Sequence, residues 1–189
     1  MKGTDDRRRQ RFDALFAAYS PSIVAYCGWR ADSASDAQDA VAEVFLAAWR
    51  RLDELPEGDA ARVWLYATAR RVLANQRRST RRREALRERL AREPSPAATE
   101  SPGAEEASVR AALMQLGPRD REVLLLSEWE DLAPAQIAEV LGCLTVTARG
   151  RLHRARRRFR NAFESLCGGD DECPAHNNDR LLRGEHQHV

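Results

Sequence analysis

The chain has 189 residues, enough for one ordinary domain or for two small domains with a linker, and 43% of them are hydrophobic. Its formal net charge is only +2, with 31 basic against 29 acidic residues, so any affinity for nucleic acid must come from local segregation of charge. The sequence lacks the apolar segment of a signal peptide and any run long enough to cross a bilayer, which predicts a cytoplasmic protein.

The segment from residue 6 to residue 92 has the pattern of an all-helical lobe. Between Pro21 and Pro56 it contains no proline, and its apolar residues recur at three- and four-residue steps without strand-like alternation. The stretch DAQDAVAEVFLAAWRRL predicts an amphipathic helix, for which Ser35 is a suitable N-cap. The apolar stripe of this helix consists of Ala37, Ala40, Val41, Val44, Phe45, Ala48, Trp49 and Leu52.

A second helix of this lobe is predicted to begin near Arg62, after the stretch DELPEGDAA, in which Pro56 and Gly58 break the helical pattern. From residue 62 to residue 92 there are eleven arginines against two glutamates, a local excess of nine. Such a run is typical either of a solvated helix or of a helix that binds a polyanion. The predicted inner stripe of the helix is Leu65, Ala69, Val72 and Leu73.

Residues 93–108, EPSPAATESPGAEEAS, mark the clearest break in composition. They include three prolines and one glycine but no basic residue. This composition predicts a flexible acidic linker between the first lobe and a second domain, residues 109–166.

The second domain has the pattern of a helix-turn-helix. Short stretches with helical spacing are separated by Gly117-Pro118 and by residues 131–134, and a last helix is predicted from about residue 145 to residue 166. Gly142 supplies the turn before this helix. The two helices pack through Ile137, Ala138, Leu141, Ala148, Leu152 and Ala155, which leaves Arg149, Arg151, His153 and Arg154 for DNA.

The stretch LGPRDREVLLLSEWEDLAPAQIAEVLGCLTVTARGRLHRARRRFR resembles the promoter-binding domain of sigma-70-type initiation factors, above all the extracytoplasmic-function (ECF) group. In the first lobe, DAVAEVFLAAWRRL is similar to the segment with which that family binds core RNA polymerase. ARVWLYATARRVLANQRR is similar to the segment that melts and reads the minus-10 element. The two matches occur in the family's order and cover most of residues 10–166.

This resemblance implies an all-α fold of two helical domains and three sets of binding residues. Polymerase would be bound by Asp39, Glu43, Phe45, Trp49 and Arg50. The loop DELPEGDAA would hold a flipped base, and the minus-10 strand would be bound by Trp64, Tyr66, Arg70, Arg71, Asn75, Arg77 and Arg78. The minus-35 element would be read by Thr147, Arg149, Arg151, His153 and Arg154.

The implied protein is an initiation factor without catalytic activity, cofactor or metal, whose partners are core RNA polymerase, promoter DNA and an anti-sigma factor. The sequence departs from the family pattern at several places. Ala42 replaces a frequent glutamine, and Arg71 replaces a frequent asparagine. The usual small polar start and Gly-Thr-Val of the recognition helix are replaced by Leu144, Val146, Thr147 and Ala148.

Several alternatives stay open at this point. Trp64 and Tyr66 are equally suited to the core, and Trp29, Trp49 and Trp129 are predicted mainly as core residues, with Cys27 and Cys143 as buried thiols. The whole chain also fits a stand-alone helix-turn-helix regulator. Residues 167–189 are predicted to be a disordered tail, with a metal- or thiol-dependent sensor as the alternative, built on Cys167, Cys173, His176, His186 and His188.

Overall fold

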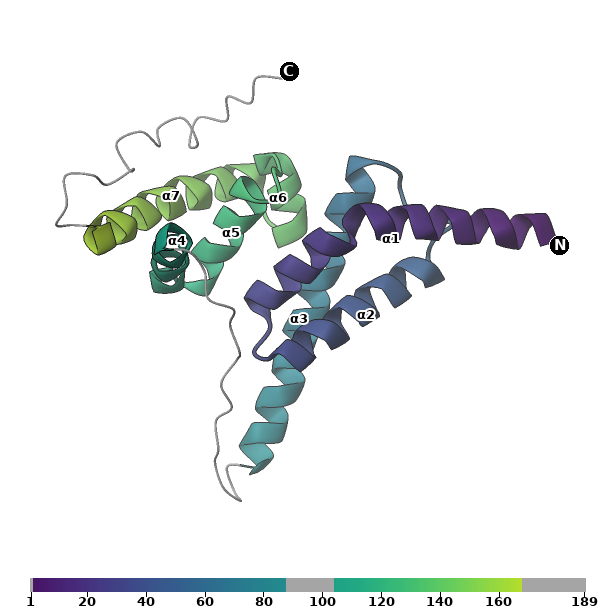
Figure 1. The fold of residues 1–189 in the computed structure, drawn as a ribbon, viewed down its shortest axis with the longest axis horizontal. Coiled ribbons are helices and arrows are strands. Elements are labelled where there is room, and N and C mark those ends of the chain that lie inside the picture. Colours follow the sequence, from purple (N-terminus) through teal and green to yellow (C-terminus); the bar gives the residue numbers. More distant parts are fainter. Residues whose placement is uncertain (1, 88–103, 168–189) are drawn as a thin grey trace.

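The computed structural model describes the backbone of residues 2–87 and 104–167, and the side chains of residues 5–80 and 107–166. Every regular element in these ranges is a helix, which confirms the all-α fold (Figure 1). None of the described helices is both long and apolar enough to cross a membrane. The helices are α1 (Lys2–Arg30), α2 (Ala34–Arg50), α3 (Asp59–Arg87), α4 (Ala104–Gln115), α5 (Pro118–Glu128), α6 (Pro134–Leu141) and α7 (Thr145–Cys167).

The first lobe consists of α1, α2 and α3, which pack against one another through the predicted apolar stripes. The N-cap of α2 is Ser33 and not Ser35: its hydroxyl accepts a hydrogen bond from the backbone N–H of Asp36 at 3.0 Å. Ser33 has the extended backbone that an N-cap requires, whereas Ser35 already lies in the first helical turn. On α3, the predicted inner stripe is buried, namely Leu65, Ala69, Val72 and Leu73.

The second lobe consists of α4 to α7, with α7 packed against the other three helices. Proline at the start of α5 and of α6 fixes the backbone angle that a first helical turn needs. Gly142 ends α6 with a left-handed backbone, φ +64°, which only glycine adopts without strain, and α7 begins three residues later. This turn sets the angle between the two helices of the predicted helix-turn-helix.

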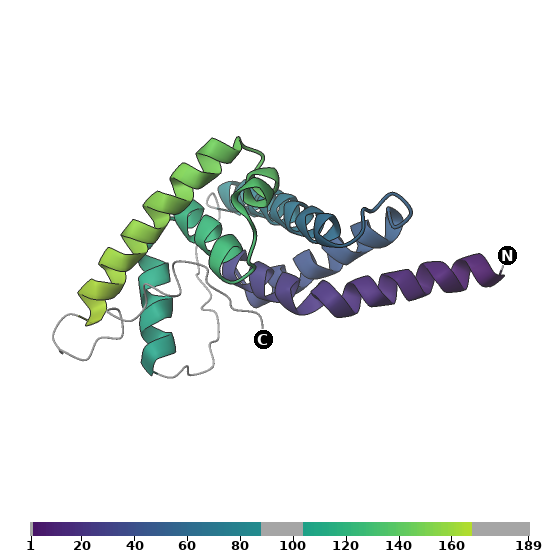
Figure 2. The ribbon, with the colours of Figure 1, turned by 90° about the horizontal axis from the view of Figure 1, so that it is seen from above.

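The two lobes contact each other mainly through α3 and α6 (Figure 2). Their buried side chains form one contiguous apolar cluster, in which Tyr66 and Leu73 of the first lobe join Leu124 and Ile137 of the second. The first helix of the helix-turn-helix therefore lies on the arginine-rich helix of the other lobe. Helix α7 packs mainly against the helices of its own lobe and points away from this contact (Figure 1).

The helix ends differ slightly from the expected domain limits. Helix α4 begins at Ala104, inside the segment 93–108 predicted as a linker, because alanine and glutamate at residues 104–107 are good helix formers. Helix α7 ends at Cys167, the first residue of the predicted tail. The rest of the tail, residues 168–189, lies outside the described residues.

Candidate nucleic-acid interface

The face of α7 opposite its packing side carries the predicted minus-35 residues. The packing side is buried, with Ala148 and Ala155 fully enclosed. Arg149, His153 and Arg154 are exposed, and Arg151 and Thr147 are half-buried. Among the described residues, no carboxylate pairs with any of the three arginines. These guanidinium groups are therefore available to phosphates and base edges.

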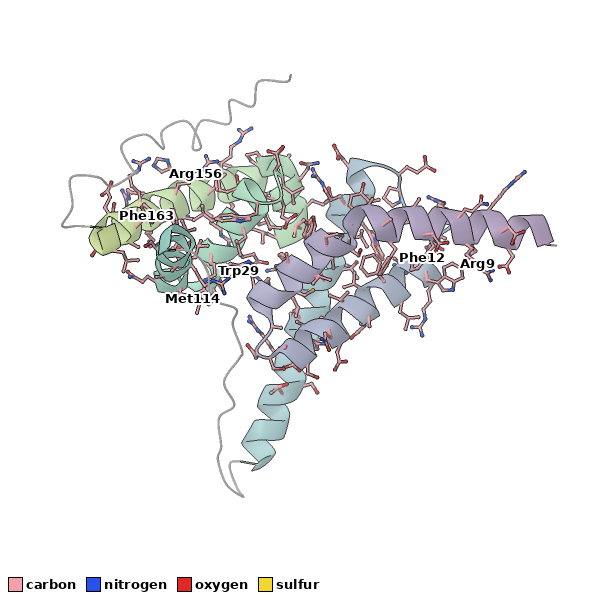
Figure 3. All side chains as sticks on the ribbon, in the orientation of Figure 1. Arg9, Phe12, Trp29, Met114, Arg156 and Phe163 are labelled. Carbon is pink, nitrogen blue, oxygen red and sulfur yellow. The ribbon has the colours of Figure 1, made fainter. Side chains whose placement is uncertain are left out.

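Other arginines of the same helix have a structural role. Arg156 donates to Oε1 of Glu128 at 2.7 Å and to the hydroxyl of Ser127 at 3.3 Å, and thereby ties α7 to α5 (Figure 3). Arg158 pairs with Asp120, also on α5. Arg156 and Arg158 therefore hold α7 against α5, unlike the three predicted minus-35 arginines.

On α3, four of the seven predicted minus-10 residues are held within the molecule. Trp64 is half-buried and packs on the core, and Tyr66, only 1% exposed, donates its hydroxyl hydrogen bond to Glu130 of the second lobe. Arg70 pairs with Glu122 of the second lobe, and Arg77 contacts Asp32 at 3.4 Å and the carbonyl of Arg30. The exposed members are Arg71, Asn75 and Arg78.

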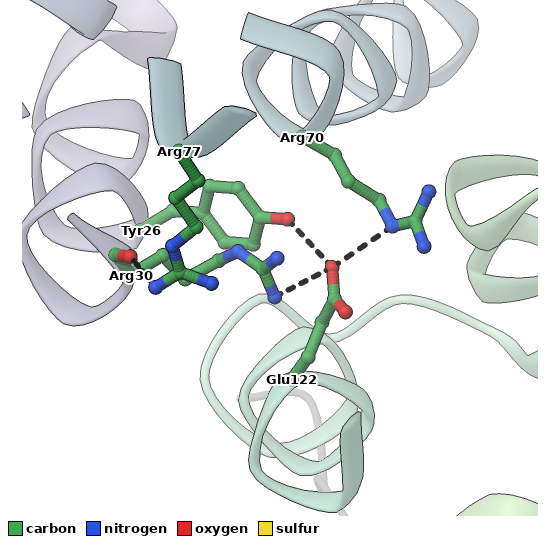
Figure 4. Close-up of polar contacts among 5 residues, drawn as sticks. All are labelled: Tyr26, Arg30, Arg70, Arg77 and Glu122. Carbon is green, nitrogen blue, oxygen red and sulfur yellow. Dashed lines mark hydrogen bonds and ion pairs between the residues drawn. The ribbon is translucent and has the colours of Figure 1, made fainter. Parts of the chain in front are cut away.

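A buried carboxylate lies at the centre of the contact between the lobes (Figure 4). Oε1 of Glu122 accepts the Tyr26 hydroxyl at 3.0 Å and the Arg70 Nε–H at 3.2 Å, and it forms an ion pair with Nη1 of Arg30 at 2.7 Å. The Glu122 side chain is 5% exposed, and that of Arg30 14%. These four residues are called the Glu122 cluster below.

The chemistry of the Glu122 cluster explains its place in the fold. A buried carboxylate is tolerated only when it is paired and hydrogen-bonded, and here all three of its donors come from the first lobe. Burial, and secondarily the negative charge of Glu122, hold the pKa of Tyr26 well above its usual value, so the phenol stays a proton donor. Sequence reasoning missed this cluster, although Glu122 directly precedes the apolar run Val123–Leu126.

The loop predicted to hold a flipped base is anchored by α1, which the sequence did not indicate. Arg11 donates to the carbonyl of Leu55 at 2.6 Å, and the hydroxyl of Tyr19 donates to the carbonyl of Gly58 at 3.2 Å. Arg8 donates to the carbonyl of Trp49, at the end of α2, at 2.9 Å. Two side chains of α1 thus hold the middle of this loop, and a third holds the end of the helix before it.

The predicted polymerase-binding residues of α2 divide into an exposed and a packed set. Asp39, Glu43 and Arg50 are exposed, while Phe45 is only 4% exposed. Trp49 is half-buried: its ring meets the Phe12 ring edge-on at 5.2 Å, and the Arg8 guanidinium lies 5.1 Å from its centroid. Phe12 points from α1 toward α2 (Figure 3).

Cys27, Cys143 and the remaining tryptophans, all predicted to be buried, differ in their exposure. Cys27 is buried as expected, and burial raises the pKa of its thiol to about 11, whereas Cys143 is half-buried. Trp29 is half-buried against the Arg110 guanidinium, 5.4 Å from the ring centroid. The prediction of a core position was wrong for Trp129, which is the C-cap of α5 and is 52% exposed.

The described residues contain no group of three or more His, Cys, Asp or Glu side chains that could hold a metal ion. The tail residues proposed as an alternative sensor, Cys173, His176, His186 and His188, lie outside the described part of the chain, as does the side chain of Cys167.

An all-α chain with a helix-turn-helix and an exposed row of arginines on its second helix belongs to the class of DNA-binding proteins. Residues 15–83 match the family model of sigma-70 region 2, and residues 106–159 match that of sigma-70 region 4. The chain is 30% identical to the ECF RNA polymerase sigma factor SigL of Mycobacterium tuberculosis, over 81% of this chain and 89% of that protein.

A second sequence relative and one solved structure are also similar to this chain. The chain is 30% identical to the ECF sigma factor SigG of Mycobacterium tuberculosis, matching 85% of its own length but only 50% of that protein. The solved structure of the sigma factor RpoE of Bartonella quintana, in complex with the anti-sigma factor NepR, matches with a TM-score of 0.68 and 21% identity over 81% of this chain and 96% of that chain. This chain belongs to the ECF group of the sigma-70 family.

Proposed function

We propose that the protein is a promoter-specific transcription initiation factor that binds core RNA polymerase and has no catalytic activity of its own. The observation that carries the proposal is the helix-turn-helix whose Arg149 and Arg154 on α7 are exposed and pair with no carboxylate of the described residues, in a chain that matches both sigma-70 regions in their order. Its proposed partners are polymerase, promoter DNA and an anti-sigma factor of the kind bound to RpoE. With such partners, its place of action is the cytoplasm, on the nucleoid.

The proposal assigns a role to each part of the chain. Residues 6–92 bind polymerase through the exposed side of α2 and bind the minus-10 strand through α3. Residues 109–166 dock α7 on the minus-35 element, and residues 93–108 connect the two domains. Residues 167–189 are not required for initiation in this proposal, so their deletion should leave promoter-directed transcription intact.

Docking on both promoter elements requires the two lobes to separate. The elements lie about 25 base pairs apart, as their names state, which corresponds to about 85 Å of duplex at ~3.4 Å per base pair. In the structure the lobes are in direct contact, with Tyr66 and Arg70 of the minus-10 set bonded to the second lobe. The Glu122 cluster therefore belongs to a closed arrangement that must open before or during promoter binding.

The proposal is tested by co-purification with bacterial core RNA polymerase, followed by transcription from genomic fragments with and without the protein. Stable association and new, defined start sites are expected. A folded protein that binds duplex DNA specifically without polymerase, and directs no new start sites, would instead identify a stand-alone regulator.

The role of Trp64 is tested in the same system. Stacking of a base on an aromatic ring contributes about 1–3 kcal/mol, so Trp64→Ala should slow open-complex formation more than it weakens polymerase binding. Equal loss of both activities would show that Trp64 is only a packing residue, consistent with its half-buried position.

A further inference from the structure

Two apolar side chains are unusually exposed at the start of the recognition helix. Leu144 is 72% exposed and Val146 is 71% exposed, more than the other large apolar residues of the described chain. Leu144 also occupies the N-cap position of α7, since its carbonyl accepts the backbone N–H groups of Thr147 and Ala148. Leucine cannot cap a helix through its side chain, so this residue contributes neither to the helix start nor to the core.

Val146 lies on the same exposed side of α7 as the predicted DNA-reading residues. Arg149 follows it by three residues and His153 by seven, and both spacings place side chains on one face of a helix. The opposite side carries the buried Ala148 and Leu152. Val146 itself is 71% exposed, so little of the described chain covers its side chain.

The chemistry of the surroundings indicates the occupant of this apolar surface. The nearest exposed neighbours along the face are Arg149 and His153, and the positive charge of the guanidinium suits DNA. The first residues of a recognition helix reach base edges in the major groove, and the apolar group displayed there is the C5-methyl of thymine.

We propose that Val146, flanked by Leu144, contacts the C5-methyl group of a thymine in the minus-35 element and thereby contributes to promoter choice. The three-residue step from Val146 to Arg149 corresponds to about 4.5 Å along the helix, comparable with the ~3.4 Å step between base pairs. The thymine is therefore expected next to the base pair that Arg149 reads. This inference rests on the proposed function, because it needs α7 to enter the major groove.

The first arm of the test removes the thymine methyl group from the DNA and leaves the protein unchanged. Holoenzyme is assembled from core polymerase and the full chain, and each minus-35 thymine of a mapped promoter is replaced in turn by deoxyuridine, which keeps base pairing and lacks only the methyl. With the wild-type protein, one such replacement should raise the half-saturating holoenzyme concentration roughly fourfold, equivalent to about 0.8 kcal/mol for one buried methyl.

The protein variants form the second arm. Val146→Ala should show the same loss on the unmodified promoter and no further loss with deoxyuridine, while Val146→Thr, which keeps one methyl, should retain part of the sensitivity. Val24→Ala is the matched control, since Val24 is a 53% exposed valine on α1; this variant should respond to deoxyuridine as the wild type does. Alanine favours the helix more than valine, so Val146→Ala is expected to fold.

Several results would overturn the inference. They are a minus-35 element without thymine, a wild-type protein that ignores deoxyuridine at every position, and a Val146→Ala protein that remains sensitive to it. Equal weakening of Val146→Ala on promoters with and without a minus-35 element would identify a protein-binding surface instead. In all these cases transcription still starts at defined sites, whereas failure of the proposed function removes the start sites altogether.

Discussion

The arginines of α3 and those of α7 differ in what they already contact. Arg70 and Arg77 of α3 are held by Glu122, by Asp32 and by the carbonyl of Arg30. Arg149 and Arg154 of α7 are exposed and, among the described residues, pair with no carboxylate. These two arginine-rich helices therefore differ in how many of their guanidinium groups can bind DNA without first losing a partner. The predicted minus-35 face is free in the closed arrangement, while part of the predicted minus-10 face is occupied by the second lobe.

Glu122→Ala should have the strongest effect, because it removes the carboxylate of the second lobe that holds Arg70 of α3. Loss of one partner of a buried ion pair costs about 3–5 kcal/mol. In the variant this cost destabilises the closed arrangement, because Arg30 stays buried there without its carboxylate. A change of about 3 kcal/mol shifts an equilibrium roughly 150-fold. The radius of gyration in solution should increase, and minus-10 single strands should bind more tightly because less opening is required.

Glu128→Ala is the matched control for that experiment. Glu128 is another poorly exposed glutamate of α5, but its partner Arg156 belongs to the same lobe. This variant should lower the thermal stability of the second lobe without increasing the radius of gyration. If Glu122→Ala leaves the radius unchanged, the cluster does not hold the lobes together.

The next effect concerns the exposed arginines of α7. Arg149→Ala should weaken discrimination at one minus-35 base pair by about 1–3 kcal/mol if its guanidinium reads guanine. Arg156→Ala removes an arginine of the same helix that is tied to Glu128, and it should reduce stability while leaving promoter preference intact. Affinities for a set of single-base promoter variants distinguish the two; identical profiles for wild type and Arg149→Ala would remove Arg149 from the reading set.

A smaller change is expected for Tyr66→Phe, which weakens a second contact between α3 and the other lobe. The variant keeps the buried ring but loses the hydroxyl that donates to Glu130, a contribution of about 0.5–1.5 kcal/mol to the closed arrangement. Lobe opening followed by small-angle scattering should increase modestly. Tyr19→Phe is the control, because the Tyr19 hydroxyl bonds only within the first lobe, to Gly58, and its loss should have no such effect.

The smallest effect is a dependence of lobe closure on pH. Burial raises the pKa of Glu130 above its ordinary value of 4.5, so the closed arrangement favours the protonated carboxyl. The stabilisation is therefore complete below pH 4.5 and is lost as the pH rises through the higher pKa of the closed arrangement. Glu130→Gln should flatten this part of the profile of opening against pH, and an unchanged profile would assign the dependence to another group.

The helices and their apolar stripes could be predicted from the sequence because they depend on local spacing. The buried stripe of α3 and the packing side of α7 follow directly from three- and four-residue steps. Gly142 could be placed in the turn because its flexibility is intrinsic to the residue. The predicted N-cap of α2 was wrong by two residues: Ser33 is the cap and not Ser35. Both are serines, so their chemistry does not distinguish them.

The Glu122 cluster could not be predicted in the same way. Its hydrogen-bonding partners Arg70 and Tyr26 lie 52 and 96 residues away along the chain, so no local spacing connects them. The same limit applies to the hydrogen bond from Tyr66 to Glu130 of the other lobe, and to the exposure of Trp129. Contacts between lobes follow from three-dimensional docking, which periodicity does not encode.

The position of Gly142 between α6 and α7 has a consequence for how this protein can evolve. Because α6 lies against the first lobe and α7 turns away from it, substitutions on the exposed side of α7 leave the packing of both lobes unchanged. Such substitutions can accumulate at little cost in stability. Copies of this chain that differ only there would keep the same contacts between the lobes while they present different side chains on α7.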